Sequence, residues 1–347
     1  MKFYTKQHAH YCGIDLHARM LYVCILDSQG ETVVHKNIKA NPDALIRLIT
    51  PYHDNLVIGV ECMFSWYWVA DLCRDEQIKF ILGHALYMKA IHGGKAKNDR
   101  IDSNKIAVLM RGGLFPQAYV YPREMRGTRD LMRRRMHLMR KRSELLAHIH
   151  NTNSQYNLPE INKDLRYMVH RDGIADRFND PSVQKSIELD LNLLEVYDQQ
   201  LGKVERYIYQ QAKTCDQHSL VLLRTVPGIG KILSLIILYE IHTIARFPSV
   251  QDFASYCRLI KCKKESAGKS YGYSGKKIGN AYLKWAFSEA AVLFLRGNPE
   301  AQAWLQRMSN KHNKARALTI LAHKLGRAVY FILQRQKMFD QERFLNS

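Results

Sequence analysis

The sequence contains no apolar run of the roughly 18 residues that a membrane-spanning helix requires. Its N-terminus also lacks the apolar core and small-residue cleavage site of a signal peptide. The seven cysteines include no Cys-x-x-Cys pair, and most lie in apolar stretches, where a free cysteine behaves as a small hydrophobic residue. These absences predict a cytoplasmic protein with reduced cysteines and no membrane anchor. A zinc site built on Cys257 and Cys262 is the less favoured alternative, because no second ligand pair lies near them.

Acidic residues are scarce relative to basic ones. The 347 residues include 52 Lys and Arg but only 32 Asp and Glu, which gives a formal net charge of +20. Such an excess repels itself in a compact fold, and a polyanion relieves the repulsion. Nucleic acid is therefore the expected partner, with a membrane surface as the competing explanation.

The first part of the chain, residues 1–122, predicts an α/β domain. Five strands are expected, at residues 11–15, 21–26, 31–38, 56–61 and 78–82, and helices at residues 42–49 and 66–75. A hairpin followed by strand–helix alternation is typical of a mixed sheet with helices on its faces.

Residues 123–215 predict a basic coiled-coil region. Nine Lys or Arg residues lie between Arg123 and Arg142, and leucines recur there every seven residues at 131, 138 and 145. A second helix carries an apolar face that includes Ile187, Leu194 and Leu201. These two helices form either an antiparallel hairpin or a pair between two protomers.

Residues 216–347 predict a mainly helical domain. Helical patterns cover residues 222–241, with a break at 227–230, and residues 281–295 and 314–334. A basic loop rich in Gly and Ser occupies residues 261–279. The predicted fold class is therefore α/β followed by all-α regions.

Four acids form the first candidate site. Asp15 and Glu61 each end an apolar strand, where an unpaired buried charge is costly. Asp99 and Asp102 are three residues apart, so they share a face if their segment is helical. Carboxylates that converge repel one another unless cations neutralise them, and Mg²⁺, or alternatively Mn²⁺, suits oxygen ligands and phosphate chemistry. The alternative is four unrelated surface acids.

Several segments are candidates for contact with nucleic acid. The Pro-Gly-Ile-Gly-Lys turn before a helix exposes backbone N–H groups, as in helix-hairpin-helix modules, although it is equally typical of an ordinary turn. The predicted phosphate contacts are Gly228, Gly230, Lys231, Lys263, Lys264, Lys269, Arg133 and Arg134. Ser266 lies among the lysines of the basic loop, and it is either a nucleophile towards a phosphodiester or a solvated phosphate contact.

Together these segments resemble insertion-sequence family one-ten, the DEDD transposases and recombinases that include the Piv-type DNA invertases. The resemblance extends over nearly the whole chain and depends on residues 13–15, 60–61, 98–102, 226–230, 265–266, 277–284 and 324–325. It implies an N-terminal RuvC-like (RNase H-fold) domain and a C-terminal transposase domain that bears a nucleophilic serine.

The resemblance also implies roles for individual residues. The acidic tetrad is carried over to Asp15, Glu61, Asp99 and Asp102, and the serine to Ser266. Ser266 would form a covalent phosphoserine link with DNA, and the metal-bound acids would assist, so that strands can be rejoined without ATP. The implied partners are donor and target DNA, a guide (bridge) RNA encoded by the element, and further copies of the chain in a dimer or tetramer.

The chain departs from the family pattern at three places. Cys62, Met63 and Phe64 follow the sheet glutamate where small residues are usual, and Arg258 stands where glycine is frequent. Ala267 separates the serine from Gly268, which leaves Ser270 as the alternative nucleophile. Two other functions stay open: a RuvC-like metal-dependent junction nuclease, and a nucleic-acid-binding protein without catalytic activity. A mobile-element transposase and a domesticated invertase fit equally well.

Overall fold

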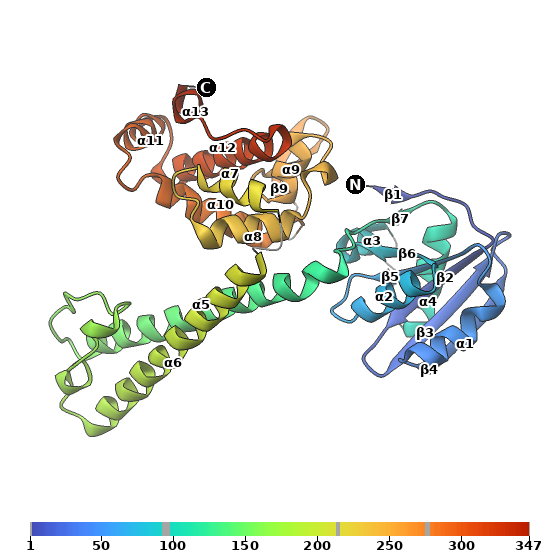
Figure 1. The fold of residues 1–347 in the computed structure, drawn as a ribbon, viewed down its shortest axis with the longest axis horizontal. Helices are drawn as coiled ribbons and strands as arrows, with labels where there is room; N and C mark the ends of the chain where they lie inside the picture. Colours follow the sequence, from blue (N-terminus) through green and yellow to red (C-terminus); the bar gives the residue numbers. More distant parts are fainter. Residues whose placement is uncertain (1, 92–97, 213–215, 275–277, 347) are drawn as a thin grey trace. The chain divides into compact units, whose positions relative to one another are not determined.

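The computed structural model describes residues 2–91, 98–212, 216–274 and 278–346 (Figure 1). The chain divides into two compact units, Met1–Glu124 (unit 1) and Met125–Ser347 (unit 2). Within the described ranges, no helix combines the length and apolar character needed to cross a bilayer. The three predicted regions remain a prediction, and the boundary at residue 215 lies outside the described residues.

Unit 1 contains a five-stranded sheet in the order β4-β3-β2-β5-β6. The strands are β2 (His10–Leu16), β3 (Met20–Asp27), β4 (Thr32–Lys39), β5 (Leu56–Glu61) and β6 (Lys79–Gly83). β2, β3 and β4 pair antiparallel, whereas β5 is parallel to both β2 and β6. This arrangement confirms the predicted mixed sheet. A separate two-stranded sheet joins β1 (Phe3–Tyr4) to β7 (Phe115–Pro116).

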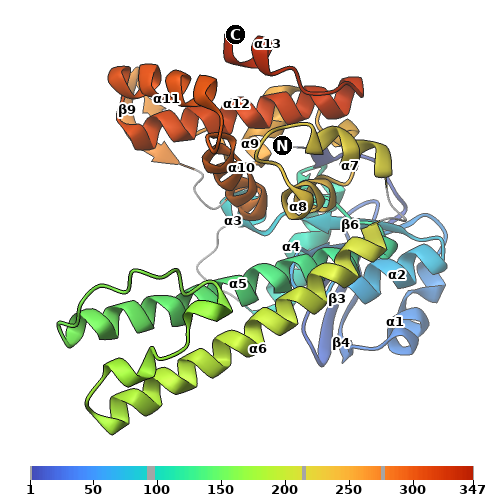
Figure 2. The same ribbon diagram turned by 60° about the vertical axis from the view of Figure 1, so that its left-hand side comes forward.

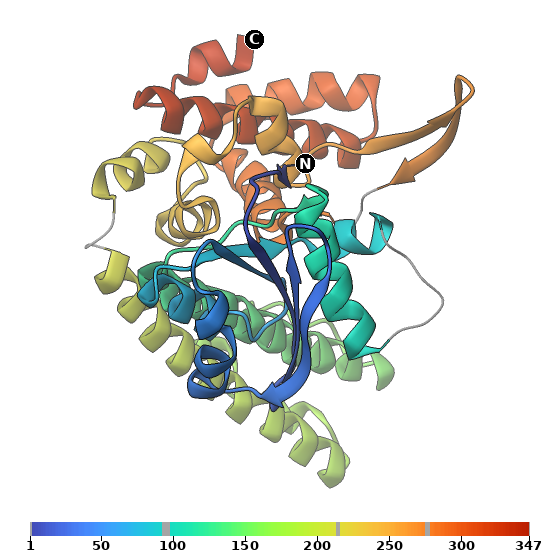
Figure 3. The same ribbon diagram turned by 90° about the vertical axis from the view of Figure 1, so that its right-hand side faces the viewer.

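Helices cover both faces of this sheet. Helices α1 (Pro42–Ile49) and α2 (Tyr67–Asp75) pack on the face that includes Ile14 and Val60. Helix α4 (Asp99–Arg111) covers the other face, where Val57 lies (Figure 3). Helix α3 (Ala85–Ile91) follows β6. Because the sheet is covered on both sides, its central strands are apolar along almost their whole length.

Unit 2 begins with two long helices, α5 (Arg123–Gln155) and α6 (Pro181–Ala212), which form an antiparallel hairpin (Figure 2). Two ion pairs define its direction, Arg135 with Glu205 and Arg142 with Asp198. The second ion pair thus lies seven residues later on α5 and seven residues earlier on α6, as antiparallel helices require. Of the two predicted arrangements, the structure shows the intramolecular hairpin.

The apolar faces of the two helices differ in how well they were predicted. On α6 the buried residues are Ile187, Leu194, Leu201 and Ile208, as expected. On α5 the leucines at 131, 138 and 145 are only half-buried, and Met132, Met136 and Ile149 are buried instead. Buried arginines share that face, so the contact is not the simple leucine seam that the spacing predicts.

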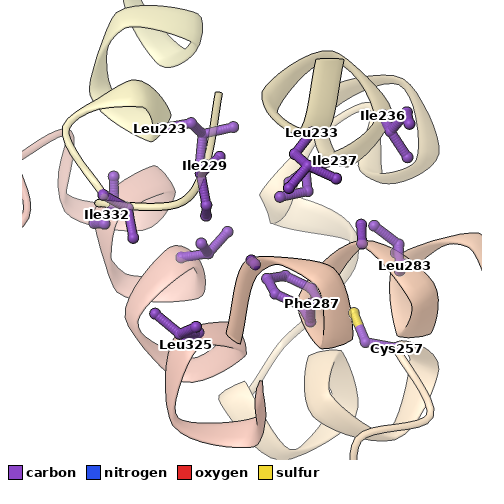
Figure 4. Close-up of a cluster of buried hydrophobic side chains, with 14 of the residues drawn as sticks. Leu223, Ile229, Leu233, Ile236, Ile237, Cys257, Leu283, Phe287, Leu325 and Ile332 are labelled. Atoms are coloured by element: carbon purple, nitrogen blue, oxygen red, sulfur yellow. The ribbon is translucent and has the colours of Figure 1, made fainter. Parts of the chain in front are cut away.

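Shorter helices complete unit 2: α7 (Gln217–Arg224), α8 (Lys231–Ile241), α9 (Val250–Tyr256), α10 (Ala281–Phe294), α11 (Pro299–Lys311), α12 (Lys314–Arg335) and α13 (Gln341–Asn346). Their core contains Ile237, Phe287 and Leu325, and Cys257 is buried among them (Figure 4). Burial raises the pKa of the Cys257 thiol well above its usual value. This apolar site argues against a zinc ligand at Cys257, while the side chain of Cys262 lies outside the described residues.

The prediction of a basic loop at residues 261–279 is wrong for part of that segment. Residues 262–274 form a β-hairpin of β8 (Cys262–Ser266) and β9 (Lys269–Ser274), hereafter the serine hairpin. Figure 3 shows it projecting from the helices of unit 2. The sequence lacks the clean polar–apolar alternation that marks a half-buried strand, because this hairpin is exposed over most of its described length.

Candidate active site

Two of the predicted acids lie side by side on the sheet. β2 and β5 are parallel neighbours, and Ile14 pairs with Val60 at the carboxyl end of the ladder. Asp15 and Glu61 are the next residues on these two strands, so the register brings them to one edge. Side chains alternate along a strand, which places Asp15 on the same face as Gly13 and opposite Ile14. That face is the one covered by α4.

Helix α4 approaches this face closely because two glycines leave room for it. A Cβ atom on Gly13 would lie 2.2 Å from the carbonyl oxygen of Ser103, and one on Gly59 would lie 2.4 Å from the Met110 sulfur. Gly13 and Gly59 are register partners on β2 and β5. The helix therefore lies directly against the backbone of both strands, next to Asp15.

The first turn of α4 supplies the other two acids. Asn98 caps the helix by accepting a 2.8 Å hydrogen bond from the Ile101 N–H. Asp99 and Asp102 follow within that turn, where the partial positive charge of the helix N-terminus favours carboxylates. Asp102 also pairs with Lys105 at 3.3 Å. The segment is thus helical, which is the condition under which the two acids share a face.

A histidine that the sequence analysis missed bridges two of the acids. The Nε2 atom of His17 lies 3.3 Å from Asp15 Oδ2 and 3.4 Å from Asp99 Oδ1. One ligand atom from each of these three residues lies within 4.8 Å of the others. The available signal was the Asp-x-His spacing at the end of a buried strand.

The electrostatics at Asp15 favour a cation. Burial raises the pKa of the Asp15 carboxyl, the charge of nearby His17 opposes that rise, and the charges of Asp99 and Asp102 add to it. A positive ion among these groups would relieve both the desolvation and the mutual repulsion. Two carboxylates and an imidazole nitrogen form a donor set suited to a divalent metal.

The serine hairpin presents Ser266 at its tip. Ser266 pairs with Lys269 across a two-residue turn in which Ala267 has φ +49° and Gly268 has φ +72°. Positive φ at both positions is typical of the turns that fit the twist of a hairpin. Glu265 pairs with Ser270 in the next register position. Ser266 is exposed.

The two candidate nucleophiles lie on different faces of this hairpin. Directly paired residues share a face and neighbours alternate, so Ser266 shares its face with Lys269. Ser270 lies on the other face, with Glu265. A cation therefore accompanies Ser266 and a carboxylate accompanies Ser270, which favours Ser266 for attack on an anionic phosphate. The side chains of Lys263 and Lys264 lie outside the described residues.

The glycines of the Pro-Gly-x-Gly turn have different surroundings. Gly228 has φ +83°, and a Cβ atom there would lie 2.5 Å from the Phe294 backbone nitrogen, so this glycine allows α10 to pack closely. Gly230 starts α8 and has open space around its Cα. The Lys231 ammonium lies over the Tyr209 ring at 4.8 Å. Gly230 is exposed, whereas Gly228 packs against α10.

The basic residues of α5 also differ from one another. Arg133 is bound by Glu240, with 2.7 Å between its Nε and Oε1. Arg134, the next residue, is exposed. Arg133 thus binds a protein carboxylate, whereas the side chain of Arg134 faces solvent.

Two family models match the chain. A DEDD transposase model of the IS110 group matches residues 12–157, and the IS116/IS110/IS902 transposase family matches residues 220–306. The first range includes all four acids and the second includes Ser266. Together they extend over most of both units.

Two relatives are similar to the chain. The transposase for insertion sequence element IS1111A of Coxiella burnetii is 18% identical over 346 residues, which cover 94% of this chain and 90% of the relative. The pilin gene-inverting protein of Moraxella bovis is 28% identical over 130 residues, covering 36% of this chain and 39% of that protein.

Proposed function

The chain belongs to the IS116/IS110/IS902 family of DNA transposases, and on that basis we propose that it cuts and rejoins DNA strands through the hydroxyl of Ser266. The observation that carries this proposal is the position of Ser266. It is exposed at the tip of a tight turn, with Lys269 on the same face. A nearby ammonium stabilises the negative charge that develops on a phosphate under attack.

The proposed step conserves phosphodiester bonds. The Ser266 Oγ forms a bond to phosphorus as the bond from phosphorus to one sugar oxygen breaks. The serine proton passes to a base, and the departing sugar oxygen takes up a proton. A sugar hydroxyl of another strand then attacks the phosphoserine, which frees Ser266 and needs no nucleoside triphosphate.

The acids of unit 1 form the second part of the proposed machinery. Asp15, Glu61, Asp99 and Asp102 would hold Mg²⁺, or Mn²⁺ in its place. Among the described residues, the ligand atoms that lie within 4.8 Å of one another come from Asp15, Asp99 and His17, and Glu61 and Asp102 are not part of this group. A bound divalent cation would stabilise negative charge on phosphate oxygens. The order of the sheet, with three antiparallel strands beside parallel ones, supports a RuvC-like (RNase H-fold) assignment for this unit.

Further proposals concern the partners. Gly230, Lys231, Arg134 and Lys269 are the proposed contacts with the DNA backbone. The net charge of +20 suits a guide RNA as well as donor and target DNA. Strand exchange requires two DNA sites to be held together, which supports a dimer or tetramer. The proposed functional regions are residues 1–122, 123–215 and 216–347.

An adduct assay tests the proposal. Labelled DNA carrying element ends is incubated with the protein, any required guide RNA and Mg²⁺, and covalent protein–DNA adducts are separated under denaturing conditions. Ser266→Ala should abolish the adduct, whereas Ser270→Ala should retain it. Undiminished adduct with Ser266→Ala would reject Ser266.

A RuvC-like nuclease is the second candidate function. Its support is that Asp15, Asp99 and His17 bring their ligand atoms together within unit 1. It predicts DNA cleavage that survives Ser266→Ala but is lost with Asp15→Ala.

A further inference from the structure

Unit 2 contains a buried ion cluster. The Glu240 carboxylate, on α8, accepts hydrogen bonds from Arg129 Nε at 3.1 Å and from Arg133 Nε at 2.7 Å. It also accepts one from Asn280 Nδ2 at 2.8 Å. Only 3% of the Glu240 side chain is exposed. The cluster therefore joins the basic half of α5 to α8 and to the start of α10.

The charge of the buried Glu240 carboxylate is compensated by its hydrogen bonds and by nearby arginines. Burial alone would raise the pKa of Glu240, but the hydrogen bond from Arg133, the charges of Arg129 and Arg133 and the bond from Asn280 together lower it. Arg133 also lies over the Tyr282 ring, 4.4 Å from its centroid. Buried ion pairs give little net stability compared with apolar packing, and in some proteins they instead specify one arrangement of the groups that they bind.

Asn280 belongs to this cluster and lies a few residues after the serine hairpin, where α10 begins. Its side-chain oxygen caps α10 by accepting from the N–H groups of Tyr282 and Leu283, at 2.9 and 3.1 Å. Its side-chain nitrogen binds Glu240, and its backbone N–H donates to the Tyr256 carbonyl at 2.6 Å. Asn280 thus fixes the point where the chain returns from the hairpin to the helices.

The segment that precedes the hairpin is bound to the segment that follows it, next to Asn280. Arg258 donates from Nε to the Gly279 carbonyl at 2.9 Å. A Cβ atom on Gly279 would lie 2.5 Å from the Tyr256 carbonyl oxygen, so the two segments are in direct backbone contact. The segments on either side of the hairpin are therefore clamped together next to the Glu240 cluster.

We propose that Arg129, Arg133 and Glu240 are positioning residues of the serine hairpin, which act through Asn280 to fix its base and thereby the orientation of Ser266. This inference rests on the proposed role of Ser266. It gives Arg133 a function in aligning the nucleophile in place of the predicted contact with nucleic acid, and it gives Arg129 the same function. None of the three needs to touch DNA for this role.

Asn280→Ser is the first test. Serine also caps helices well, so this variant keeps the cap of α10 and loses the donor to Glu240. We expect faster amide hydrogen exchange in residues 262–274, unchanged DNA binding, and adduct formation slowed roughly tenfold or more, since small misplacements of reacting groups are costly. Asn298→Ser is the matched control, because Asn298 caps α11 and forms no contact with this cluster.

A triple variant with Glu240→Leu, Arg129→Met and Arg133→Met is the second test. It removes all three charges together, so no buried charge is left unpaired. We expect a folded protein with the same loosened hairpin and slowed adduct formation.

Amide hydrogen exchange and adduct formation are measured in separate experiments. The proposal would be overturned if residues 262–274 of Asn280→Ser exchanged their amide hydrogens at the same rate as in the parent protein. It would also be overturned if both variants formed adduct as fast as the parent. If the parent forms no adduct at Ser266, the proposed function fails, while hydrogen exchange still decides whether the cluster holds the hairpin. If the triple variant does not fold, Asn280→Ser decides alone.

Discussion

The carbonyl oxygen of Ser103 lies only 2.2 Å from the position that a Cβ atom on Gly13 would occupy. No side chain fits between them, so α4 can rest on β2 only if residue 13 is glycine. This contact brings the first turn of α4, with Asp99, next to Asp15. The geometry of the acidic site therefore depends on a residue that carries no functional group.

Gly13→Ala should displace α4 and lower the free energy of unfolding by about 1–3 kcal/mol, as is typical of overpacking. It should also weaken divalent-metal binding, because Asp99 moves with the helix. Denaturant unfolding and calorimetric titration with Mn²⁺ measure the two effects. Gly127→Ala is the control: that glycine lies within α5 with no atom near its missing Cβ, and alanine there should stabilise by about 0.5–1 kcal/mol. Parental metal affinity in Gly13→Ala would contradict the account.

Divalent metal should raise the thermal midpoint of the parent protein, because it binds the folded state selectively. Asp15→Asn should abolish the shift. His17→Asn should reduce the shift with Mn²⁺ more than with Mg²⁺, since an imidazole nitrogen suits the former better. Differential scanning fluorimetry after chelation and re-addition of each metal gives the comparison. An identical response of parent and Asp15→Asn would rule out metal binding at this edge of the sheet.

Acid should weaken unit 2 through Glu240. Its pKa is lowered in the folded state, so its contribution to stability is present above the ordinary glutamate pKa and is lost as the pH falls through the folded value. Glu240→Gln leaves two buried arginines poorly paired and should destabilise at neutral pH by about 3–5 kcal/mol. The difference from the parent should shrink in acid, as measured by urea unfolding across a pH series. A difference that stays constant with pH would show that the Glu240 charge contributes nothing.

The neighbouring arginines of α5 should behave differently. Arg134→Ala should weaken DNA binding and reduce the salt dependence of the binding constant by about one unit of slope, because one phosphate contact is lost. Its effect on stability should be small, since Arg134 is exposed. Arg133→Ala should instead lower the thermal midpoint, because it leaves Glu240 with one arginine fewer. Fluorescence anisotropy in a salt series measures DNA binding by the two variants. An unchanged salt slope for Arg134→Ala would exclude Arg134 from the contact with DNA.

Local sequence pattern predicted much of unit 1. The strand at residues 56–61 and the helix at residues 42–49 have their predicted bounds, since an apolar run between polar turns and an amphipathic pattern are local signals. The positions of Asp15 and Glu61 on neighbouring strands followed from the sequence because each acid ends an apolar run. His17 was missed because its contact with Asp99 depends on the close approach of α4.

Features that depend on distant contacts could not be predicted. Glu240 is an acid within an apolar helix, and only the fold reveals that its partners lie about 110 residues earlier on α5. The sequence predicts a loop where the serine hairpin lies, since the turn has Ala267 where Asn is typical. The structure also explains a departure from the family pattern: Arg258 has φ +55°, a conformation in which glycine is favoured.

The central claim is that Ser266 becomes covalently linked to DNA. The most direct measurement is mass spectrometry of protein trapped with cleaved DNA, digested with nuclease and protease, to locate the residue that carries a nucleotide remnant. We expect the remnant on Ser266, with none on Ser270. A remnant on another residue, or cleaved DNA with no protein-linked nucleotide, would contradict it.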